Sequence, residues 1–172
     1  LGPSSFPWPS VENRLCPVVF VPCLSEEDYG RSSKSNEGQV QLAWHILKLL
    51  RTAREGADGS TLPSVSVAIL TPYSRQVQLL KQTIPATLDA VVSTIDGFQG
   101  READIVVFTT VRSNAEGDIG FLEDARRLNV AWTRPRLGLI VVGNQGTLQT
   151  KPLWQRAISA CRIVEISVPE AT

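Results

Sequence analysis

The sequence predicts an α/β fold, with a mostly parallel sheet covered by helices on both faces. Apolar runs of strand length alternate along the chain with segments whose apolar residues recur at helical spacing. The runs are apolar at consecutive positions, which is typical of parallel strands buried on both faces. At 172 residues, with 42% hydrophobic and 20% charged residues, the chain has the size and composition of one ordinary domain.

The first 15 residues are expected to form an extended strap that lies on the domain, and residues 16–172 to form the domain itself. Three prolines stand in this stretch beside Phe6 and Trp8, and proline disfavours regular structure. The dipeptide Gly2-Pro3 could be a tag remnant.

The predicted elements follow in order. A helix is expected to begin after Asn36, which would act as its cap, and to stop at Gly56, because apolar residues recur at helical spacing between them. A proline-initiated helix is expected after Pro152. Further helices are predicted over 75–82 and 124–136, and strands over 17–24, 65–70, 91–95, 105–110, 139–142 and 163–168.

Composition excludes several classes of function. Lys and Arg together number 17, as do Asp and Glu, so nucleic-acid binding would need a local groove and not a basic surface. Three cysteines without a Cys-x-x-Cys pair, and one histidine, are too few for a zinc site. No apolar run approaches the roughly 18 residues needed to span a membrane. We expect an intracellular chain, in the cytoplasm or nucleus, with no metal site and no signal for homo-oligomerisation.

Three strand ends carry unusually polar segments. Residues 70–76 place a hydroxyl at a strand tip, and residues 93–104 combine hydroxyls with glycines at which a backbone could approach an anion closely. Residues 124–136 form an arginine-rich helix, in which Arg127 and Arg134 are seven apart and project from one face. Guanidinium groups suit phosphate, and ligands of parallel sheets bind at the carboxyl ends of strands. Taken singly, the same features fit a solvated helix face and an ordinary turn.

Together and in this order, the three segments resemble the C-terminal motor domain of superfamily-1 helicases, in the up-frameshift and senataxin-like branch. The matching stretches read Leu-Thr-Pro-Tyr at 70–73, Ile-Asp-Gly-Phe-Gln-Gly-Arg-Glu-Ala-Asp at 95–104, and Arg-Arg-Leu-Asn-Val-Ala-Trp-Thr-Arg-Pro-Arg at 126–136. The resemblance implies a RecA-like domain that closes over ATP and Mg²⁺ held mainly by an N-terminal RecA-like domain of the same parent chain.

The resemblance also implies roles for individual residues. Arg134 matches the arginine finger that reaches the γ-phosphate, and Glu102 matches the acid that hydrogen-bonds the nucleotide ribose. Gly100 belongs with the nucleotide-binding residues, and Arg127 would contact phosphate or pair with Glu102. Asp104 is expected to be a structural hydrogen-bond acceptor. Five residues match positions that hold the backbone of single-stranded RNA or DNA: Thr71, Pro72, Ser93, Thr94 and Gln99.

Two residues depart from the family pattern. Trp132 stands where relatives commonly have a smaller aliphatic residue, and Pro135 where they commonly have alanine. Proline biases the residue before it away from helical geometry, so the helix is expected to end at Arg134.

The phosphate loop and the Walker-type acidic pair of a complete motor are absent from the sequence. We therefore expect the chain to be the second motor domain of an ATP-dependent helicase that moves 5′ to 3′, and to be inactive as an ATPase by itself. The alternative is a degenerate helicase domain that acts as a non-catalytic docking module for nucleic acid or protein.

Overall fold

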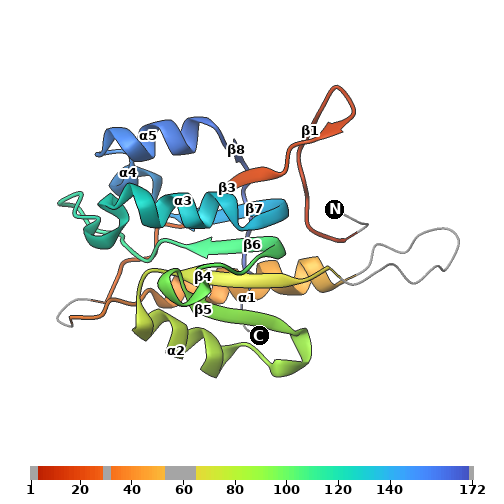
Figure 1. Ribbon diagram of the computed structural model, residues 1–172, viewed down its shortest axis with the longest axis horizontal. Coiled ribbons are helices and arrows are strands. Elements are labelled where there is room, and N and C mark those ends of the chain that lie inside the picture. The colour runs from red at the N-terminus through yellow and green to blue at the C-terminus, as the bar shows by residue number, and fades with distance from the viewer. Residues whose placement is uncertain (1–3, 29–31, 53–64, 171–172) are drawn as a thin grey trace, which may run out of the picture.

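A computed structural model of the protein describes residues 4–28, 32–52 and 65–170, and its centre is one parallel sheet (Figure 1). The strands of this sheet are β3 (Val18–Pro22), β4 (Val67–Thr71), β5 (Ala90–Thr94), β6 (Ala103–Thr109), β7 (Pro135–Gly143) and β8 (Arg162–Ile163). Their order is β5-β4-β6-β7-β3-β8, and every neighbouring pair is parallel. The predicted α/β class is confirmed.

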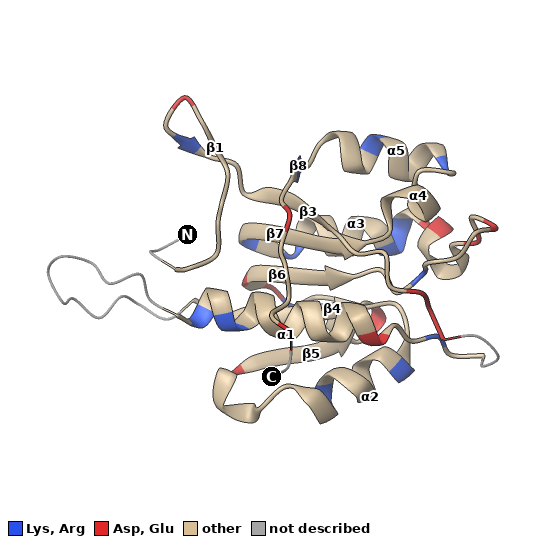
Figure 2. Ribbon diagram, turned by 180° about the vertical axis from the view of Figure 1, so that it is seen from behind, with Lys and Arg blue, Asp and Glu red and all other residues tan. Residues whose placement is uncertain are grey.

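Helices cover both faces of this sheet. One face carries α1 (Glu37–Arg51) and α2 (Ser74–Thr83), and the other carries α3 (Ala125–Thr133), α4 (Gln145–Leu148) and α5 (Pro152–Ser159). Helix α3 lies in front of the sheet in Figure 1, and α1 lies in front in Figure 2, which is seen from behind. Single 3₁₀ turns occur at η1 (Ala86–Leu88), η2 (Asp96–Phe98) and η3 (Gly120–Glu123).

The alternation of side chains in each strand produces two cores, one on each side of the sheet. In β6, Ile105 and Val107 pack on the face that carries α1 and α2, whereas Val106 and Phe108 pack on the face that carries α3, α4 and α5. Successive residues of a strand point to opposite faces. Because both faces are covered, the middle of each central strand is apolar on both faces, as the sequence pattern indicates.

Trp154 is the largest fully buried side chain, and it joins α5 to the sheet. Its ring stacks on that of Phe108 at 6.4 Å, and its indole N–H donates to the carbonyl of Leu122 at 3.0 Å. Trp132 of α3 packs edge-on against it at 6.0 Å. The bulky residue at position 132 therefore has a defined place between α3 and α5.

Asn36 caps α1, as predicted. Its Oδ1 accepts a hydrogen bond from the backbone N–H of Gln39 at 3.0 Å, and its Nδ2 donates to the carbonyls of Ser25 and Val111 at 2.7 and 3.0 Å. The helix ends at Arg51, before Gly56, which lies outside the described residues.

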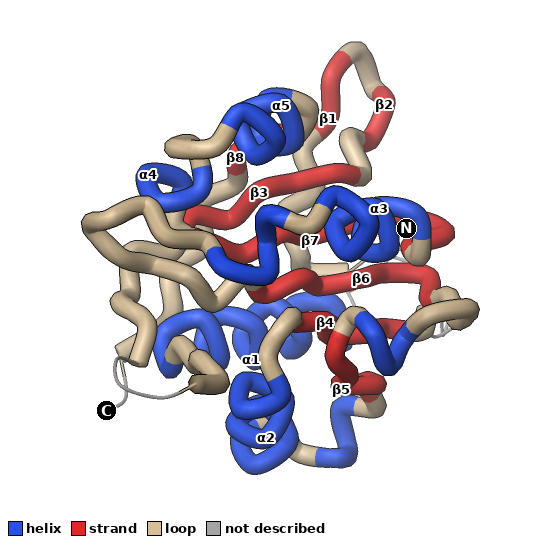
Figure 3. The backbone as a smooth tube through the Cα atoms, turned by 60° about the vertical axis from the view of Figure 1, so that its left-hand side comes forward, coloured by secondary structure: helices blue, strands red, loops and turns tan. Residues whose placement is uncertain are grey.

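Two parts of the chain differ from the sequence prediction. The strand expected over 163–168 is only the two-residue β8, which lies at the sheet edge and pairs with β3 alone. Regular structure was not expected at the N-terminus, yet β1 (Ser10–Val11) and β2 (Arg14–Leu15) form a hairpin that projects beyond β3 in Figure 3. Positive φ angles at both turn residues fit a two-residue hairpin loop.

Phe6 precedes this hairpin and is only 2% exposed, as part of the core beneath α1. The backbone N–H of Ser5 donates to the carbonyl of Leu49 in α1 at 3.0 Å. The first residues thus contribute to the core, and a domain boundary at residue 15 stays a prediction. None of the described helices has the length and apolar character needed to cross a membrane.

We predict that Asn36→Ala lowers the free energy of unfolding by about 1 to 3 kcal/mol, since it removes the cap and leaves two carbonyls without their donor. Urea denaturation followed by circular dichroism measures the change. Glu37→Ala is the control, because Glu37 is exposed in the first helical turn and should change stability by less than about 0.5 kcal/mol. Equal losses in the two variants would contradict the role of the cap.

Candidate functional site

Two neighbouring chain segments on one face of the sheet carry most of the candidate residues. Residues 95–102 lead from the carboxyl end of β5 to the amino end of β6, and the nine-residue helix α3 leads to the amino end of β7. Contacts join the two segments at both ends: Arg127 pairs with Asp96 at 3.1 Å, and the carbonyl of Arg134 accepts from Ala103 N–H at 3.2 Å. A helix of this length spans about 14 Å, so the candidates form two separate groups.

The first group lies at the amino ends of β6 and β7 and contains Gly100, Glu102 and Arg134. These three candidates thus lie at the amino ends of strands, and not at the carboxyl ends where ligands of parallel sheets usually bind. Arg134 follows the last residue of α3, and β7 begins at Pro135. The helix thus ends one residue before Arg134, close to the predicted end. Arg134 itself keeps helical φ and ψ angles of −82° and −27°, so the expectation that Pro135 moves it away from helical geometry is wrong.

The side chain of Arg134 makes no hydrogen bond or ion pair with any residue that the structure describes. The residue is partly buried, and its Nε atom is fully buried without a partner. A buried N–H group that lacks an acceptor is costly, so native structures seldom keep one without a reason. The Nε–H of Arg134 is thus a buried donor that no described residue satisfies.

Glu102 is exposed, and a second arginine holds it. Nη1 of Arg136 donates to Oε1 of Glu102 at 2.8 Å, while Nε of Arg136 donates to Oδ1 of Asp104 at 2.9 Å. Oδ2 of Asp104 accepts from the backbone N–H of Ser66 at 2.9 Å. The hydrogen bond from Ser66, followed by that from Arg136, lowers the pKa of Asp104. The expected structural role of Asp104 is confirmed, and Oε2 of Glu102 faces no described partner.

Gly100 adopts a φ of +75°, in the left-handed region that favours glycine. A Cβ atom added there would meet nothing within 4 Å. The backbone conformation, and not a lack of space, therefore requires glycine at this position.

The second group surrounds an open hollow of about 340 Å³ at the carboxyl ends of β4 and β5. We call it the carboxyl-edge hollow. Its walls combine polar side chains with the aromatic rings of Tyr73 and Phe121, whose centroids lie 5.2 Å apart. The lining residues are Ser32, Ser33, Pro72, Tyr73, Ser74, Thr94, Asp96, Phe121 and Arg127.

Arg127 lines this hollow and does not lie with Gly100, Glu102 and Arg134. Its Nε and Nη2 donate to the two carboxylate oxygens of Asp96 at 3.2 and 3.1 Å. Its guanidinium also lies 4.9 Å from the centroid of the Phe121 ring. The partner of Arg127 is thus Asp96 and not Glu102, because Glu102 lies at the opposite edge of the sheet.

The five predicted nucleic-acid contacts fall in different places. Pro72 and Thr94 line the carboxyl-edge hollow, and Oγ1 of Thr94 accepts from the backbone N–H of Gly97 at 3.1 Å. The hydroxyl of Ser93 donates to the carbonyl of Thr94 at 2.8 Å. Gln99 is exposed, and its side chain makes no hydrogen bond with a described residue.

Thr71 is fully buried, so its hydroxyl does not face the hollow. The residue instead supports the neighbouring segment, since its carbonyl accepts from the backbone N–H of Ile95 at 3.0 Å. We therefore remove the Thr71 side chain from the set of direct contacts.

The sequence did not assign a role to three residues that line the hollow, Tyr73, Asp96 and Phe121. Each of them lies within or beside one of the polar segments that match the family, so a signal was present. Ser32 and Ser33 carried no signal, because they lie in a polar stretch without periodicity. Their position in the hollow follows only from the tertiary fold.

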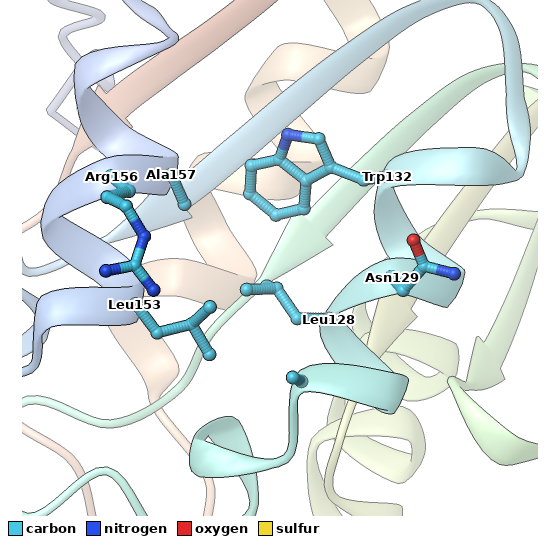
Figure 4. A pocket seen from close by; sticks show the side chains of 7 residues that line it. Leu128, Asn129, Trp132, Leu153, Arg156 and Ala157 are labelled. Atoms are coloured by element: carbon cyan, nitrogen blue, oxygen red, sulfur yellow. The ribbon is translucent and has the colours of Figure 1, made fainter.

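The opposite face of α3 is apolar, and it forms a second groove with α5 (Figure 4). Leu128 and Trp132 share this face, as their spacing predicts, and Leu153 and Ala157 of α5 lie across from them. Among the described residues, no group of three or more His, Cys, Asp or Glu side chains could hold a metal ion.

Comparison with known proteins places these motifs in a family. A family model described as an AAA domain matches residues 4–146. The chain is 43% identical over 120 residues to "DNA polymerase alpha-associated DNA helicase A" of Saccharomyces cerevisiae, which covers 68% of this chain and 16% of that protein. It is 36% identical over 167 residues to "Regulator of nonsense transcripts 1" of Dictyostelium discoideum, which covers 91% of this chain and 12% of that protein.

A third relative, "Regulator of nonsense transcripts 1 homolog" of Arabidopsis thaliana, is 36% identical over 159 residues, or 87% of this chain and 12% of that protein. The chain thus spans less than a fifth of the length of these relatives. The parallel sheet has the architecture expected of a RecA-like domain. The chain belongs to the superfamily-1 helicases of the up-frameshift and senataxin-like branch, as their C-terminal RecA-like domain.

Proposed function

We propose that this chain is the second motor domain of an ATP-dependent helicase and that Arg134 is its arginine finger. The observation that carries the proposal is the buried, unpartnered Nε of Arg134 at the amino edge of the sheet. Two other arginines, Arg136 at the same edge and Arg127 at the opposite edge, are held by carboxylates of this domain. Arg134 is the one of the three with its guanidinium available to a ligand.

ATP with Mg²⁺ would supply the phosphoryl group that is transferred, and the bound nucleotide would lie mainly on a preceding RecA-like domain of the parent protein. In the closed motor, Arg134 would donate to the γ-phosphate and stabilise the charge that develops there. Fingers of this kind accelerate hydrolysis by about 10³ to 10⁵. Oε2 of Glu102 would accept from a ribose hydroxyl, with Arg136 holding the carboxylate in place. The open surface at Gly100 leaves room for the nucleotide.

For nucleic acid, we propose that the carboxyl-edge hollow and the adjacent Gln99 hold the backbone of single-stranded RNA or DNA. The hydroxyl of Thr94 and the amide of Gln99 suit contacts to phosphate and sugar, which position a strand without reading its sequence. Few such contacts are needed, so a domain of zero net charge can take this role. By resemblance to the family, we infer 5′ to 3′ movement and an intracellular location.

We predict that Arg134→Ala lowers the strand-stimulated ATPase of the parent helicase by about a thousandfold or more, with strand binding retained. Steady-state kinetics with single-stranded RNA and DNA measure the effect. Arg126→Ala is the matched control, because Arg126 is an exposed arginine of the same helix whose side chain has no described partner. An unchanged rate in Arg134→Ala would place the finger elsewhere. No stimulated activity in the wild type would support the docking-module alternative.

The chain alone is predicted not to hydrolyse ATP above background, with or without single strands. Its described residues offer no acidic cluster for a metal ion, and its sequence lacks a phosphate loop. Phosphate release by the purified chain measures this. Robust ATP hydrolysis that copurifies with the chain would contradict the proposal that a second motor domain is needed to bind and hydrolyse ATP.

We expect Gln99→Ala to weaken single-strand binding by the parent helicase about fivefold, the effect of one hydrogen bond worth roughly 1 kcal/mol. Fluorescence anisotropy with labelled RNA and DNA strands measures the affinity. Gln82→Ala is the control, because Gln82 is an exposed glutamine on α2 whose side chain contacts no described residue. Unchanged affinity in Gln99→Ala would remove this residue from the interface.

A further inference from the structure

A buried ionic cluster lies next to the carboxyl-edge hollow, and Arg112 is at its centre. Arg112 is 7% exposed and Glu27 is 4% exposed. Nε of Arg112 donates to both oxygens of Glu27 at 3.2 and 3.0 Å, and Nη2 pairs with Asp118 at 3.0 Å. Nη1 donates to the hydroxyl of Tyr73 at 3.1 Å. One guanidinium therefore holds three chain segments together.

The backbone beside Arg112 is strained in a way that directs its side chain. Val111 has a φ of +69°, which is a real outlier for a β-branched residue. The N–H of Arg112 donates to the carbonyl of Thr110 at 2.7 Å, which completes a γ-turn of the strained, positive-φ kind. Such conformations cost about 1 to 3 kcal/mol and need support from their surroundings.

The first turn of α1 supplies this support. The side-chain carbonyl of Gln39 accepts from the N–H of Val111 at 2.8 Å, and the amide of Asn36 donates to the carbonyl of Val111 at 3.0 Å. Both side chains are fully buried. These hydrogen bonds stabilise the strained turn at Val111, and the turn sets the position of the Arg112 side chain.

Gly120 shows how closely this guanidinium and the Tyr73 hydroxyl are packed. The residue has a φ of +50°. A Cβ atom there would overlap Nη1 of Arg112 and would lie 2.8 Å from the Tyr73 hydroxyl. Little freedom remains for either group, so the position of Tyr73 depends on Arg112.

The contacts continue from Tyr73 to the helix that ends at the finger. The Tyr73 ring lies 5.2 Å from the ring of Phe121, and Phe121 lies 4.9 Å from the guanidinium of Arg127. Arg127 is in the first turn of α3, and Arg134 follows the last residue of that helix. Tyr73 and Phe121 both line the hollow, whereas Arg112 does not.

We propose that Arg112 and Tyr73 are positioning residues that couple a strand in the carboxyl-edge hollow to the orientation of α3, and so to Arg134. This inference rests on the proposed function. A strand in the hollow would meet the exposed ring of Phe121, which packs on the nearly buried ring of Tyr73 and touches α3 through Arg127. Arg112 holds the Tyr73 hydroxyl in place through a hydrogen bond. Because Tyr73 is fixed, a strand that displaces Phe121 would shift α3 and would not shift Tyr73.

The test is Tyr73→Phe in the parent helicase, which removes one hydroxyl and keeps the ring contact with Phe121. We expect the ATPase kcat at saturating single strand to fall about tenfold. The strand concentration for half-maximal stimulation should change less than about twofold, because the variant loosens a support and removes no strand contact. Steady-state kinetics give both values, and thermal melting shows that the variant is folded.

Arg112→Lys is the second variant. Lysine keeps a positive charge beside Glu27, but one ammonium group cannot reproduce the fork that reaches three partners. It should lower kcat in the same way, and combining it with Tyr73→Phe should cause little further loss. Glu123→Gln is the control, because Glu123 is in the η3 turn next to Phe121 but pairs outward with Lys151 at 3.1 Å. Its kcat should equal that of the wild type.

An unchanged kcat in a folded Tyr73→Phe variant of an active helicase would overturn the inference and leave the cluster a structural support. A raised half-saturation concentration with kcat retained would also overturn it, since Tyr73 would then be a strand contact. A wild-type helicase without strand-stimulated ATPase would instead overturn the proposed function, and the inference with it.

Discussion

Parallel strand pairing is the constraint on which the placement of both candidate sites depends. After every strand the chain has to return from the carboxyl edge of the sheet to the amino edge. Residues 95–102 and helix α3 are two such returns on the same face. The beginning of each return lies at the hollow, and the end lies at the proposed nucleotide edge. One pair of adjacent crossovers therefore supplies both sites and joins them by the length of α3.

Charge pairing within the domain explains how a chain of zero net charge can take the proposed role in nucleotide and nucleic-acid binding. Arg112 is held by Glu27 and Asp118, Arg127 by Asp96, and Arg136 by Glu102 and Asp104. These pairs join segments at the two edges and neutralise their arginines within the domain. The side chain of Arg134 stands outside this pairing within the described chain. The proposed chemistry thus rests on a partly buried arginine without a described partner, and not on a basic surface.

Local signals in the sequence predict local structure well here. The cap at Asn36, the end of α3 at Pro135 and the apolar runs of β4, β6 and β7 each follow from neighbouring residues. What depends on distant contacts is not predictable in this way. The pairing of Arg127 with Asp96, the burial of the Thr71 hydroxyl and the hydrogen bond from Arg112 to Tyr73 require the packed crossovers. The motifs thus identify the candidate residues, but only the fold divides them into two groups.

The same packing defines what can move at the finger. The backbone N–H of Arg134 donates to the carbonyl of Val130 at 3.1 Å, and its carbonyl accepts from Ala103 at 3.2 Å. Pro135 then begins β7, so the backbone of the finger is tied to helix and sheet at once. The large ring of Trp132 packs toward α5, away from this junction. Freedom at the finger therefore lies in its side chain and in the tilt of α3, and the first turn of that helix is in contact with the hollow through Arg127. A proline at position 135 is compatible with the proposed finger, because the last hydrogen bond of α3 and the pairing with Ala103 both hold the backbone of Arg134.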